Sequence, residues 1–348
     1  MRLTVVFVVG SGVMALLYIF SEHEIHRNNG FVRRYPHHPV ELVRGYDLTY
    51  NSYYIAGFAD GNVYLGNVTS PLDVVEIDTL LNNRKSFRIR LKGNADYPFS
   101  AVQIRIAPPY FFLSDGTVPI IYRGSMRDWV AHKYADGATR FSQWEVVDST
   151  NIVVRSIDED GNVVGLVGKD GKFKKGIGLL EKQVDGIFDT DGTLNYNESL
   201  KAIAYTYYYR NGFVTADTNF GNVYRGRTID TVSRQHIKIV YEDSSRLQSM
   251  AKQPTQIQKF SYSSGRYLFT ISDRLGKYEE EELLKDAVIV DVYDIINHTY
   301  EFSFYLYNYK NDRVRSFRVY NNLIVAMTQR HLVIYKMKQK EFDFSMSE

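Results

Sequence analysis

Arginines next to tyrosines are the side chains of this sequence best suited to binding a ligand. Tyr-Arg-Gly occurs at 122–124 and again at 224–226, and another arginine follows each copy. If both copies face one side of the molecule, their guanidinium groups would offer forked donors to carboxylates or phosphates, and the tyrosines could stack on sugars. The alternative is a set of solvated strand ends with packed stems. The candidate ligand-binding residues are Tyr122, Arg123, Arg127, Tyr224, Arg225 and Arg227.

The carboxylates of Asp189 and Asp191 are a second candidate. The sequence IFDTDGTL, from Ile187 to Leu194, resembles the first motif of haloacid-dehalogenase-type phosphatases. The resemblance implies a nucleophilic first aspartate, an acid/base second aspartate and a bound magnesium ion. In that family, however, the motif ends a parallel strand and helices follow it, whereas Leu200–Tyr209 is aromatic and strand-like. We expect a hairpin turn here instead.

Asp158–Asp160 and Asp189–Asp191 also have a spacing found in calcium-binding loops. An EF-hand loop needs a further ligand at its fifth position and a glutamate at its twelfth, and neither segment supplies both. Asp-Gly is a common way to reverse a β-strand, so we expect turns. The sequence predicts no metal site and no cofactor, and calcium at these aspartates is the alternative.

No catalytic nucleophile can be identified. The chain has no cysteine, which excludes thiol nucleophiles, thiolate metal sites and disulfides, and it has no Gly-x-Ser-x-Gly element. Single histidines within predicted strands and loops are expected to be structural or surface residues, and those before residue 40 to lie in an exposed linker. We therefore name no catalytic residue. The two groups are His132, His236, His298 and His331, and His23, His26, His37 and His38.

The composition favours β-sheet and disfavours nucleic acid as a partner. The chain contains 28 tyrosines, 20 phenylalanines and only 8 prolines, and aromatic residues fit the half-buried surface of a sheet. The formal net charge is +2 and no basic block occurs. A protein that binds nucleic acid through many phosphates would need such a block.

A repeated hairpin pattern predicts the elements that would position these residues. The segments YYIAGFADGNVYLG (Tyr53–Gly66) and GFVTADTNFGNVYRG (Gly212–Gly226) share Gly-Asn-Val-Tyr-x-Gly, and weaker copies occupy Tyr110–Gly124 and Ile152–Gly165. Each has a short apolar run, a polar turn and a second alternating run, which is typical of a β-hairpin. Because one blade cannot bury both of its faces, the repetition favours a closed β-propeller.

The spacing of turn glycines predicts the number of blades. Gly61, Gly116, Gly161 and Gly221 are 55, 45 and 60 residues apart. A four-stranded blade takes about 40–50 residues, so we expect six blades of four antiparallel strands. The expected blades are 47–80, 87–129, 141–188, 200–241, 257–307 and 314–337. An acidic insertion, Tyr278–Lys285, interrupts the fifth and should be solvated, with a partner-docking helix as the alternative.

The last strands resemble those of a known family. The segments VIVDVYDIINHTYEFSF, beginning at Val288, and LIVAMTQRHLVIYKM, beginning at Leu323, are similar to strands of TolB-like six-bladed propeller proteins. In these proteins a strand carries an apolar run, an aspartate, a turn and a further edge strand. The resemblance covers about residues 47–337. It implies a binding or scaffolding role and assigns no functional residue.

The N-terminus begins with an apolar segment. Leu3–Phe20 contains no charge and is long enough for a marginal transmembrane helix. Small residues suited to cleavage are missing after it, so we expect an uncleaved signal-anchor, with a cleaved signal peptide as the alternative. Arginines follow the segment and argue for the opposite orientation, but large domains translocate largely regardless of flanking charge. The expected parts are an anchor at 1–21, a polar linker at 22–40 and a propeller domain at 41–348.

These expectations favour a non-enzymatic propeller on the outer side of the membrane, facing the periplasm or exterior. Its partner would be a protein or a small polar or glycan ligand bound on one rim. The alternative is an exported propeller enzyme, a hydrolase or lyase acting on a glycan or other polymer. Clustered Asp, Glu, His and Arg at the ring centre, with shifted carboxyl pKa values, would favour the enzyme, and a bare channel with a patch on one rim would favour the binder.

Overall fold

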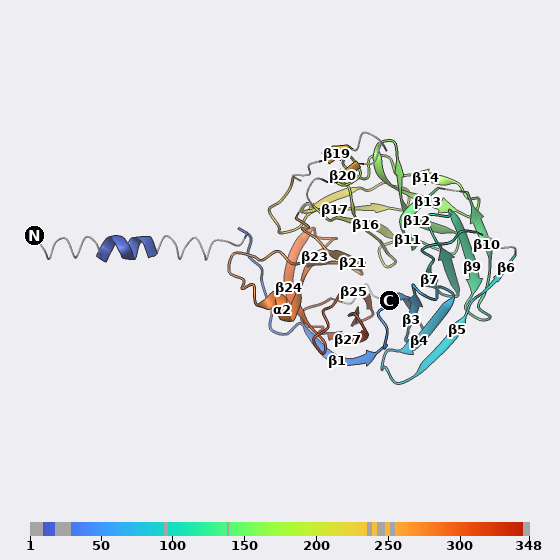
Figure 1. Cartoon of the computed structure of the whole chain (residues 1–348), viewed down its shortest axis with the longest axis horizontal. Helices are drawn as coiled ribbons and strands as arrows, with labels where there is room; N and C mark the ends of the chain where they lie inside the picture. The colour runs from blue at the N-terminus through green and yellow to red at the C-terminus, as the bar shows by residue number, and fades with distance from the viewer. Residues whose placement is uncertain are drawn as a thin grey trace, which may run out of the picture.

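The chain forms one ring of six β-sheets, the blades of a propeller (Figure 1). The computed structural model describes residues 10–17, 29–93, 97–137, 139–234, 239–241, 248–250 and 255–343. Within each blade, neighbouring strands run antiparallel from an inner strand at the ring axis to an outer strand at the rim, except for one short added strand in blade two. The predicted fold class, an all-β propeller of six blades, is confirmed.

Five blades consist of strands that follow one another in the sequence. Blade one contains β2 (Tyr53–Ala59), β3 (Asn62–Asn67), β4 (Asp73–Asp78) and β5 (Arg84–Arg88). Blade two contains β7 (Gln103–Ala107), β8 (Tyr110–Ser114), β9 (Ile120–Ser125) and β10 (Val130–Asp136), with the added strand β6 (Arg90–Lys92) parallel to β10. Blade three contains β11 (Phe141–Val146), β12 (Asn151–Asp158), β13 (Gly161–Gly168) and β14 (Phe173–Lys175).

Blade four contains β15 (Gly192–Asn197), β16 (Ala202–Tyr207), β17 (Gly212–Asp217) and β18 (Tyr224–Arg227). A separate hairpin, β19 (Ile239–Tyr241) and β20 (Gln248–Met250), follows it, so the expected end of blade four at residue 241 is too late. Blade five contains β21 (Phe260–Ser264), β22 (Tyr267–Ser272), β23 (Ala287–Asp294) and β24 (Thr299–Tyr307), with the short helix α2 (Leu283–Asp286) between β22 and β23.

Strands from both ends of the chain make up blade six and close the ring. Its inner strands are β25 (Ser316–Tyr320), β26 (Leu323–Met327) and β27 (His331–Met337), and its outermost strand is β1 (Val40–Asp47). The pairing of β1 with β27 runs antiparallel from Val40 opposite Met337 to Asp47 opposite His331. Sequence analysis missed β1 as part of this blade, because a rim strand is largely exposed and carries little apolar periodicity.

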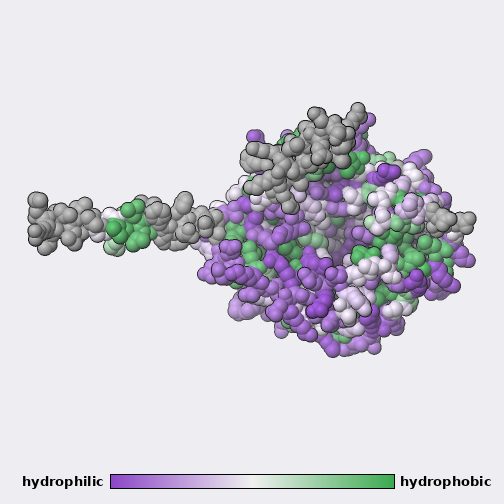
Figure 2. All heavy atoms as spheres, in the orientation of Figure 1, coloured by the Kyte–Doolittle hydropathy of each residue, from purple (hydrophilic) through white to green (hydrophobic). Residues whose placement is uncertain are grey.

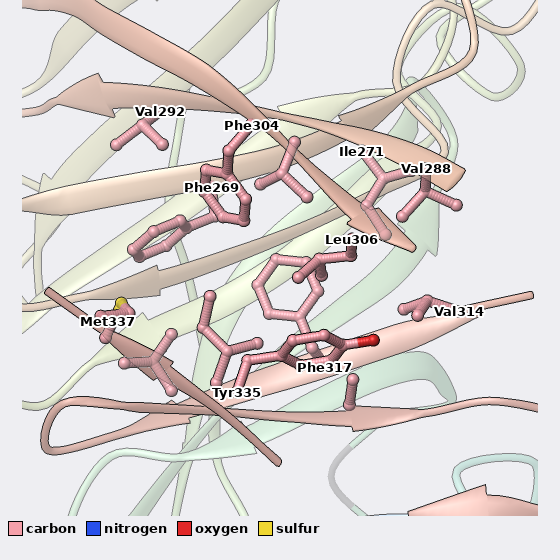
Figure 3. Close-up of a cluster of buried hydrophobic side chains, with 14 of the residues drawn as sticks. Phe269, Ile271, Val288, Val292, Phe304, Leu306, Val314, Phe317, Tyr335 and Met337 are labelled. Atoms are coloured by element: carbon pink, nitrogen blue, oxygen red, sulfur yellow. The ribbon is translucent and has the colours of Figure 1, made fainter. Parts of the chain in front are cut away.

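The hydrophobic core lies between blades. Phe269 and Phe304 of blade five meet Phe317 and Tyr335 of blade six, all of them buried (Figure 3). The rings of Phe269 and Phe317 pack edge to face, with centroids 6.1 Å apart. Large aromatic side chains fill the wedge-shaped space between two twisted sheets, which accounts for the many phenylalanines and tyrosines of the sequence.

The repeated hairpins share a packing arrangement and not a position in the blade. In three copies the first-strand aromatic lies directly opposite the final glycine, and its ring covers that glycine so closely that a Cβ would overlap it. The pairs occupy strands one and two of blade one, two and three of blade two, and three and four of blade four. The pairs are Tyr54 with Gly66, Phe111 with Gly124, and Phe213 with Gly226.

The Asp-Gly turn of the first hairpin has the expected geometry. Ala59 pairs with Asn62, so two residues connect β2 to β3. Both of these, Asp60 (φ 49°) and Gly61 (φ 76°), lie in the left-handed region. This is the type I′ turn that matches the twist of paired strands, and it favours Gly at such a position.

The predicted signal-anchor falls mostly outside the described residues. Residues 10–17 are helical, and residues 3–9 and 18–20 of the predicted anchor are not described. Within the part of the chain that the structure covers, no helix is both long enough and apolar enough to cross a bilayer.

Residues 29–39 form a strap that packs against blade five, although the sequence suggested an exposed linker over this range. Arg33 is buried, and its guanidinium binds the buried carboxylate of Asp291 through two nitrogens (2.6 and 3.1 Å) and Glu279 through a third (2.6 Å). Burial opposes the charge of Arg33, but Asp291 and Glu279 outweigh this effect and raise the pKa of Arg33. The backbone of β24 joins the strap where Ser303 N–H donates to the Arg34 carbonyl (2.8 Å).

The acidic insertion of blade five has one structural glutamate. Glu279 accepts hydrogen bonds from Arg33 and from the hydroxyl of Tyr35 (2.7 Å), whereas Glu280, Glu281 and Glu282 are exposed. The insertion is therefore solvated in part, as expected, and in part it fixes the strap. Its helix α2 has only 4 residues.

Replacing Arg33 by Ala should lower the free energy of unfolding by about 3–5 kcal/mol, because Asp291 would be left buried without its cation. The matched control is Arg34→Ala, in the same strap but exposed, which should change stability by less than about 1 kcal/mol. Chemical denaturation of both variants measures the difference. Equal, small changes in the two variants would contradict a stabilising role of the strap.

Candidate functional site

The inner strands of all six blades line a cavity on the ring axis, of about 310 Å³. Side chains two residues apart on an inner strand point to the same face, so alternate residues of each inner strand turn toward the axis. The cavity is the central channel. One lining residue from each blade, in ring order, is Tyr54, Gln103, Glu145, Asn195, Tyr262 and Arg318.

Two arginines and one glutamate meet inside this channel. Arg318 of blade six donates from Nη2 to Oε1 of Glu145 in blade three (2.7 Å), and Arg105 of blade two donates from Nε to Oε2 (3.2 Å). Blades three and six are opposite each other in a ring of six, so the first contact spans the channel. Between 14% and 18% of each side chain is exposed. We call these three residues the channel triad.

Aromatic rings hold both guanidinium groups in place. The Arg105 guanidinium carbon lies 5.3 Å from the centre of the Trp144 ring, and that of Arg318 lies 5.5 Å from the centre of the Tyr262 ring. Such cation–π contacts fix the plane of each guanidinium. Burial raises the pKa of Tyr262 to about 12, against the opposing effect of Arg318.

Polar side chains also join neighbouring inner strands. The hydroxyl of Tyr54 accepts from the Ile104 N–H (2.7 Å) between blades one and two. The Gln143 amide donates to the Gly192 carbonyl and accepts from the Leu194 N–H, both at 2.7 Å, between blades three and four. These bonds hold the lining rigid, which a binding site needs.

The channel lining holds charged and polar groups. No histidine lines it in the part of the chain that the structure describes. Both oxygens of Glu145 accept hydrogen bonds from guanidinium groups. The arrangement can orient and bind a polar molecule.

The predicted ligand-binding residues of blade two lie outside the channel. Tyr122 is buried in the core. Arg123 lies between the rings of Tyr110 and Tyr134, at 4.7 and 4.5 Å, and donates to the Ser149 carbonyl. Arg127 is exposed in the turn before β10.

The predicted ligand-binding residues of blade four lie on its outermost strand, β18. Tyr224 stacks on His298 with ring centres 3.4 Å apart, Arg225 forms an ion pair with Glu181 (2.6 Å), and Arg227 is exposed. They belong to the fourth strand of blade four, whereas Arg123 is on the third strand of blade two. The interpretation that the two sets occupy equivalent places is therefore wrong, and ligand binding by either set stays a prediction.

The phosphatase interpretation of Asp189 is corrected by the fold. Asp189 and Asp191 lie in the loop from β14 to β15, which joins blade three to blade four, so they are neither at the end of a parallel strand nor in the hairpin turn that the sequence suggested. Asp189 is completely buried, and its carboxylate accepts backbone N–H groups of Gln183, Val184 and Gly186. Asp191 binds Arg155. Both carboxylates organise the loop.

The possible calcium loop at Asp158 is likewise occupied by protein groups. Asp158 binds Lys175 and accepts the Asp160 N–H (2.9 Å). Among the residues that the structure describes, no three His, Asp or Glu side chains come close enough together to hold a metal ion.

The predicted roles of single histidines can be compared for three positions. His331 is buried, and its Nδ1 lies 2.9 Å from Asp312. His298 stacks on Tyr224, and His132 is exposed. These are structural and surface positions, as expected, and His236 lies outside the described residues.

A larger cavity, about 670 Å³, lies at the rim between the strap, β1 and β24. Its walls carry stacked rings of Tyr35 and Tyr305 with centroids 4.7 Å apart, and the exposed ring of Tyr307. Burial raises the pKa of Tyr335, at its base, to about 12. Unlike the channel, it does not bring together groups from all six blades.

Sequence analysis missed the channel triad. Arg105, Glu145 and Arg318 are far apart in the sequence, and each looks like an ordinary charged residue in a short strand. The sequence does contain a signal that could have found these residues. On the first strand of several blades, the side chains that line the channel are two residues apart. These pairs are Gln103 and Arg105, Gln143 and Glu145, Thr193 and Asn195, Phe260 and Tyr262, and Ser316 and Arg318.

Neither a known protein family nor a curated protein matches this chain. Among solved structures, virginiamycin B lyase from Staphylococcus aureus is 11% identical, with 86% of this chain and 100% of that chain covered and a TM-score of 0.50. A streptogramin B lyase is 10% identical, with 86% and 98% covered and a TM-score of 0.51. A protein from Bacteroides fragilis, described as exported, is 7% identical, with 89% and 98% covered and a TM-score of 0.50. At these identities the likeness shows the fold alone, and the TolB-like resemblance stays a prediction.

Replacing Asp189 by Ala should lower the free energy of unfolding by about 1–3 kcal/mol, because buried N–H groups would lose their acceptor. Calcium or magnesium should leave the melting temperature of the unmodified protein unchanged. Asp160→Ala, at an exposed turn position, is the control and should have an effect below about 0.5 kcal/mol. A metal-dependent rise in melting temperature that Asp189→Asn abolishes would restore the metal-site interpretation.

Proposed function

We propose that this protein is a non-catalytic binding propeller, held at the outer face of a membrane by its N-terminal apolar segment, which takes a small polar ligand in its central channel. The observation that carries the proposal is the channel triad, where charged groups from three blades converge in a cavity of about 310 Å³. This volume is in the range of small-molecule sites, which combine apolar walls with a few converging polar groups.

The charged cluster on the ring axis is the arrangement expected of the enzyme alternative, but two features of the lining lead us to favour binding. Glu145 is engaged on both oxygens, and the serines of the lining, Ser142 and Ser316, have no histidine beside them in the described lining. A hydrolase or lyase needs a group that moves a proton at the substrate. A ligand receptor needs a rigid, preorganised lining, and the inter-blade hydrogen bonds supply it.

The strap supports the proposed attachment to a membrane. It joins the ring along the outer edge of blade five, fixed by Arg33 to Asp291 and Glu279. An anchor that precedes this strap would attach to the side of the ring and leave the channel uncovered. The face shown in Figure 2 is largely hydrophilic, as expected for a propeller surrounded by water. The fold is shared with a protein described as exported, which agrees with a position outside the cytoplasm.

Ligand binding in the channel can be followed with a single-tryptophan variant. The chain has 2 tryptophans: Trp144 is buried between blades two and three with its ring beside Arg105 at the channel wall, and Trp129 lies in the core between blades one and two. In Trp129→Phe, we expect a ligand from a metabolite library to change the emission of Trp144. The matched control Trp144→Phe, which reports only on the core between blades one and two, should show no change with the same ligand.

Each outcome of this screen bears on the proposal. The response of Trp144 should be lost when Tyr262→Ala widens the channel. A library in which no compound changes the emission of Trp144 would contradict a channel site. Conversion of a bound compound to product, detected by mass spectrometry and abolished in Glu145→Gln, would replace the binding proposal by an enzymatic one.

Membrane attachment is tested separately by cell fractionation. The full chain should sediment with membranes and be degraded by protease added to cells with a permeabilised outer envelope. A variant that begins at residue 29 should be found in the soluble fraction. Protection from protease in such cells would contradict the proposed orientation.

A further inference from the structure

The channel triad also indicates which ligands the channel selects. We propose, resting on the proposed function, that the ligand carries a carboxylate, which Arg105 and Arg318 bind together within the channel. The proposal therefore adds a class of ligand to the site and a role for each member of the triad. Glu145 is the resident carboxylate, and its negative charge opposes that of the ligand.

Both guanidinium groups keep donors that Glu145 does not use. A guanidinium has five N–H groups in a planar fork. Glu145 accepts from Nη2 of Arg318 and from Nε of Arg105, and Arg105 gives another N–H to the Ile104 carbonyl (3.2 Å). The remaining donors are attached to groups that other contacts already orient. A second carboxylate is the group whose shape fits such a fork.

The charge of the triad favours an anion. It has two cations and one anion, and the further carboxylate that influences both Arg318 and Tyr262, that of Glu198, is exposed. Solvent screens an exposed charge far more than one in a cavity. The channel therefore keeps an excess of positive charge, which repels cations and attracts anions.

A purely structural role explains the triad less well. A partly buried ion pair adds little to stability, because the loss of hydration offsets the Coulomb attraction, and a second arginine adds an uncompensated charge. The partly exposed ring of Tyr262 adds a flat surface beside Arg318. A carboxylate attached to a sugar or aromatic ring would fit both features.

Matched pairs of probes test the charge requirement. Glucuronate is compared with glucose, and benzoate with benzamide, by the emission of Trp144 in the Trp129→Phe protein and by calorimetry at low ionic strength. We expect the carboxylates to bind at least about tenfold more tightly than their neutral partners, as expected for a hydrogen bond to a charged group. Inorganic phosphate is a further arm, which distinguishes a carboxylate site from a general anion site.

Two substitutions in the triad should have opposite effects on carboxylate affinity. Arg318→Gln should weaken binding by about tenfold or more, because it removes one fork. Glu145→Gln should strengthen binding, because it removes the like charge of the resident carboxylate and leaves both arginines. A structural triad would give weaker binding or lower stability in both variants, so the increase in Glu145→Gln separates the two explanations. Arg88→Gln, an arginine of the exposed rim strand β5, is the control for net charge.

The outcomes separate this inference from the proposed function. Equal binding of charged and neutral probes, or tighter binding of phosphate than of carboxylates, overturns the inference and leaves a channel site. If Arg88→Gln weakens carboxylate binding as much as Arg318→Gln does, the attraction is nonspecific and the inference is overturned. If no probe binds, the inference fails, and the library screen then decides the proposed function. If Arg318→Gln does not fold, as judged by its melting curve, the sign of the change in Glu145→Gln decides.

Discussion

The closure of the ring by the pairing of β1 with β27 is the contact on which the rest of this structure depends. A four-stranded sheet has two apolar faces, and in this chain each face is buried against the next blade. The arrangement works only if the last blade also meets the first. Because β1 lies before the first blade in the sequence and β27 in the last blade, seven residue pairs between them at the rim join the two ends of the ring. Separating them would expose the faces of blades one and six together.

Ring closure also creates the channel. Six inner strands converge on one axis, and the period of a β-strand turns alternate residues toward that axis. Residues distant in sequence therefore become neighbours, as Glu145 and Arg318 do across the channel. Here the fold brings together two cations and one anion, and nearby rings hold them in fixed orientations. Which charged side chains meet in the channel therefore depends on which residues of the inner strands β7, β11 and β25 turn toward the axis.

The strap uses the same kind of interaction for a different purpose. Arg33 is buried against two carboxylates, whereas the channel triad places two arginines against one carboxylate. In the strap, the carboxylates of Asp291 and Glu279 neutralise the charge of Arg33, and these contacts hold the strap against blade five. In the channel an excess of donors remains beside a cavity. The charges of the strap therefore serve the structure, whereas the unused donors of the channel are the basis of the binding that we propose.

The sequence by itself determined the class of fold and the number of blades, because hairpin periodicity and turn glycines are local properties. Asp60-Gly61 is a type I′ turn, as expected, and apolar runs such as Ala287–Asp294 are buried strands. It did not reveal the rim strands, since β1 and β5 are exposed and lack an apolar pattern. It suggested that Tyr122–Gly124 and Tyr224–Gly226 are equivalent, because a hairpin of the same local form can occupy any strand pair of a blade. Only the tertiary structure brought Arg105, Glu145 and Arg318 together, because the contacts among them depend on how blades close around an axis and not on any spacing along the chain.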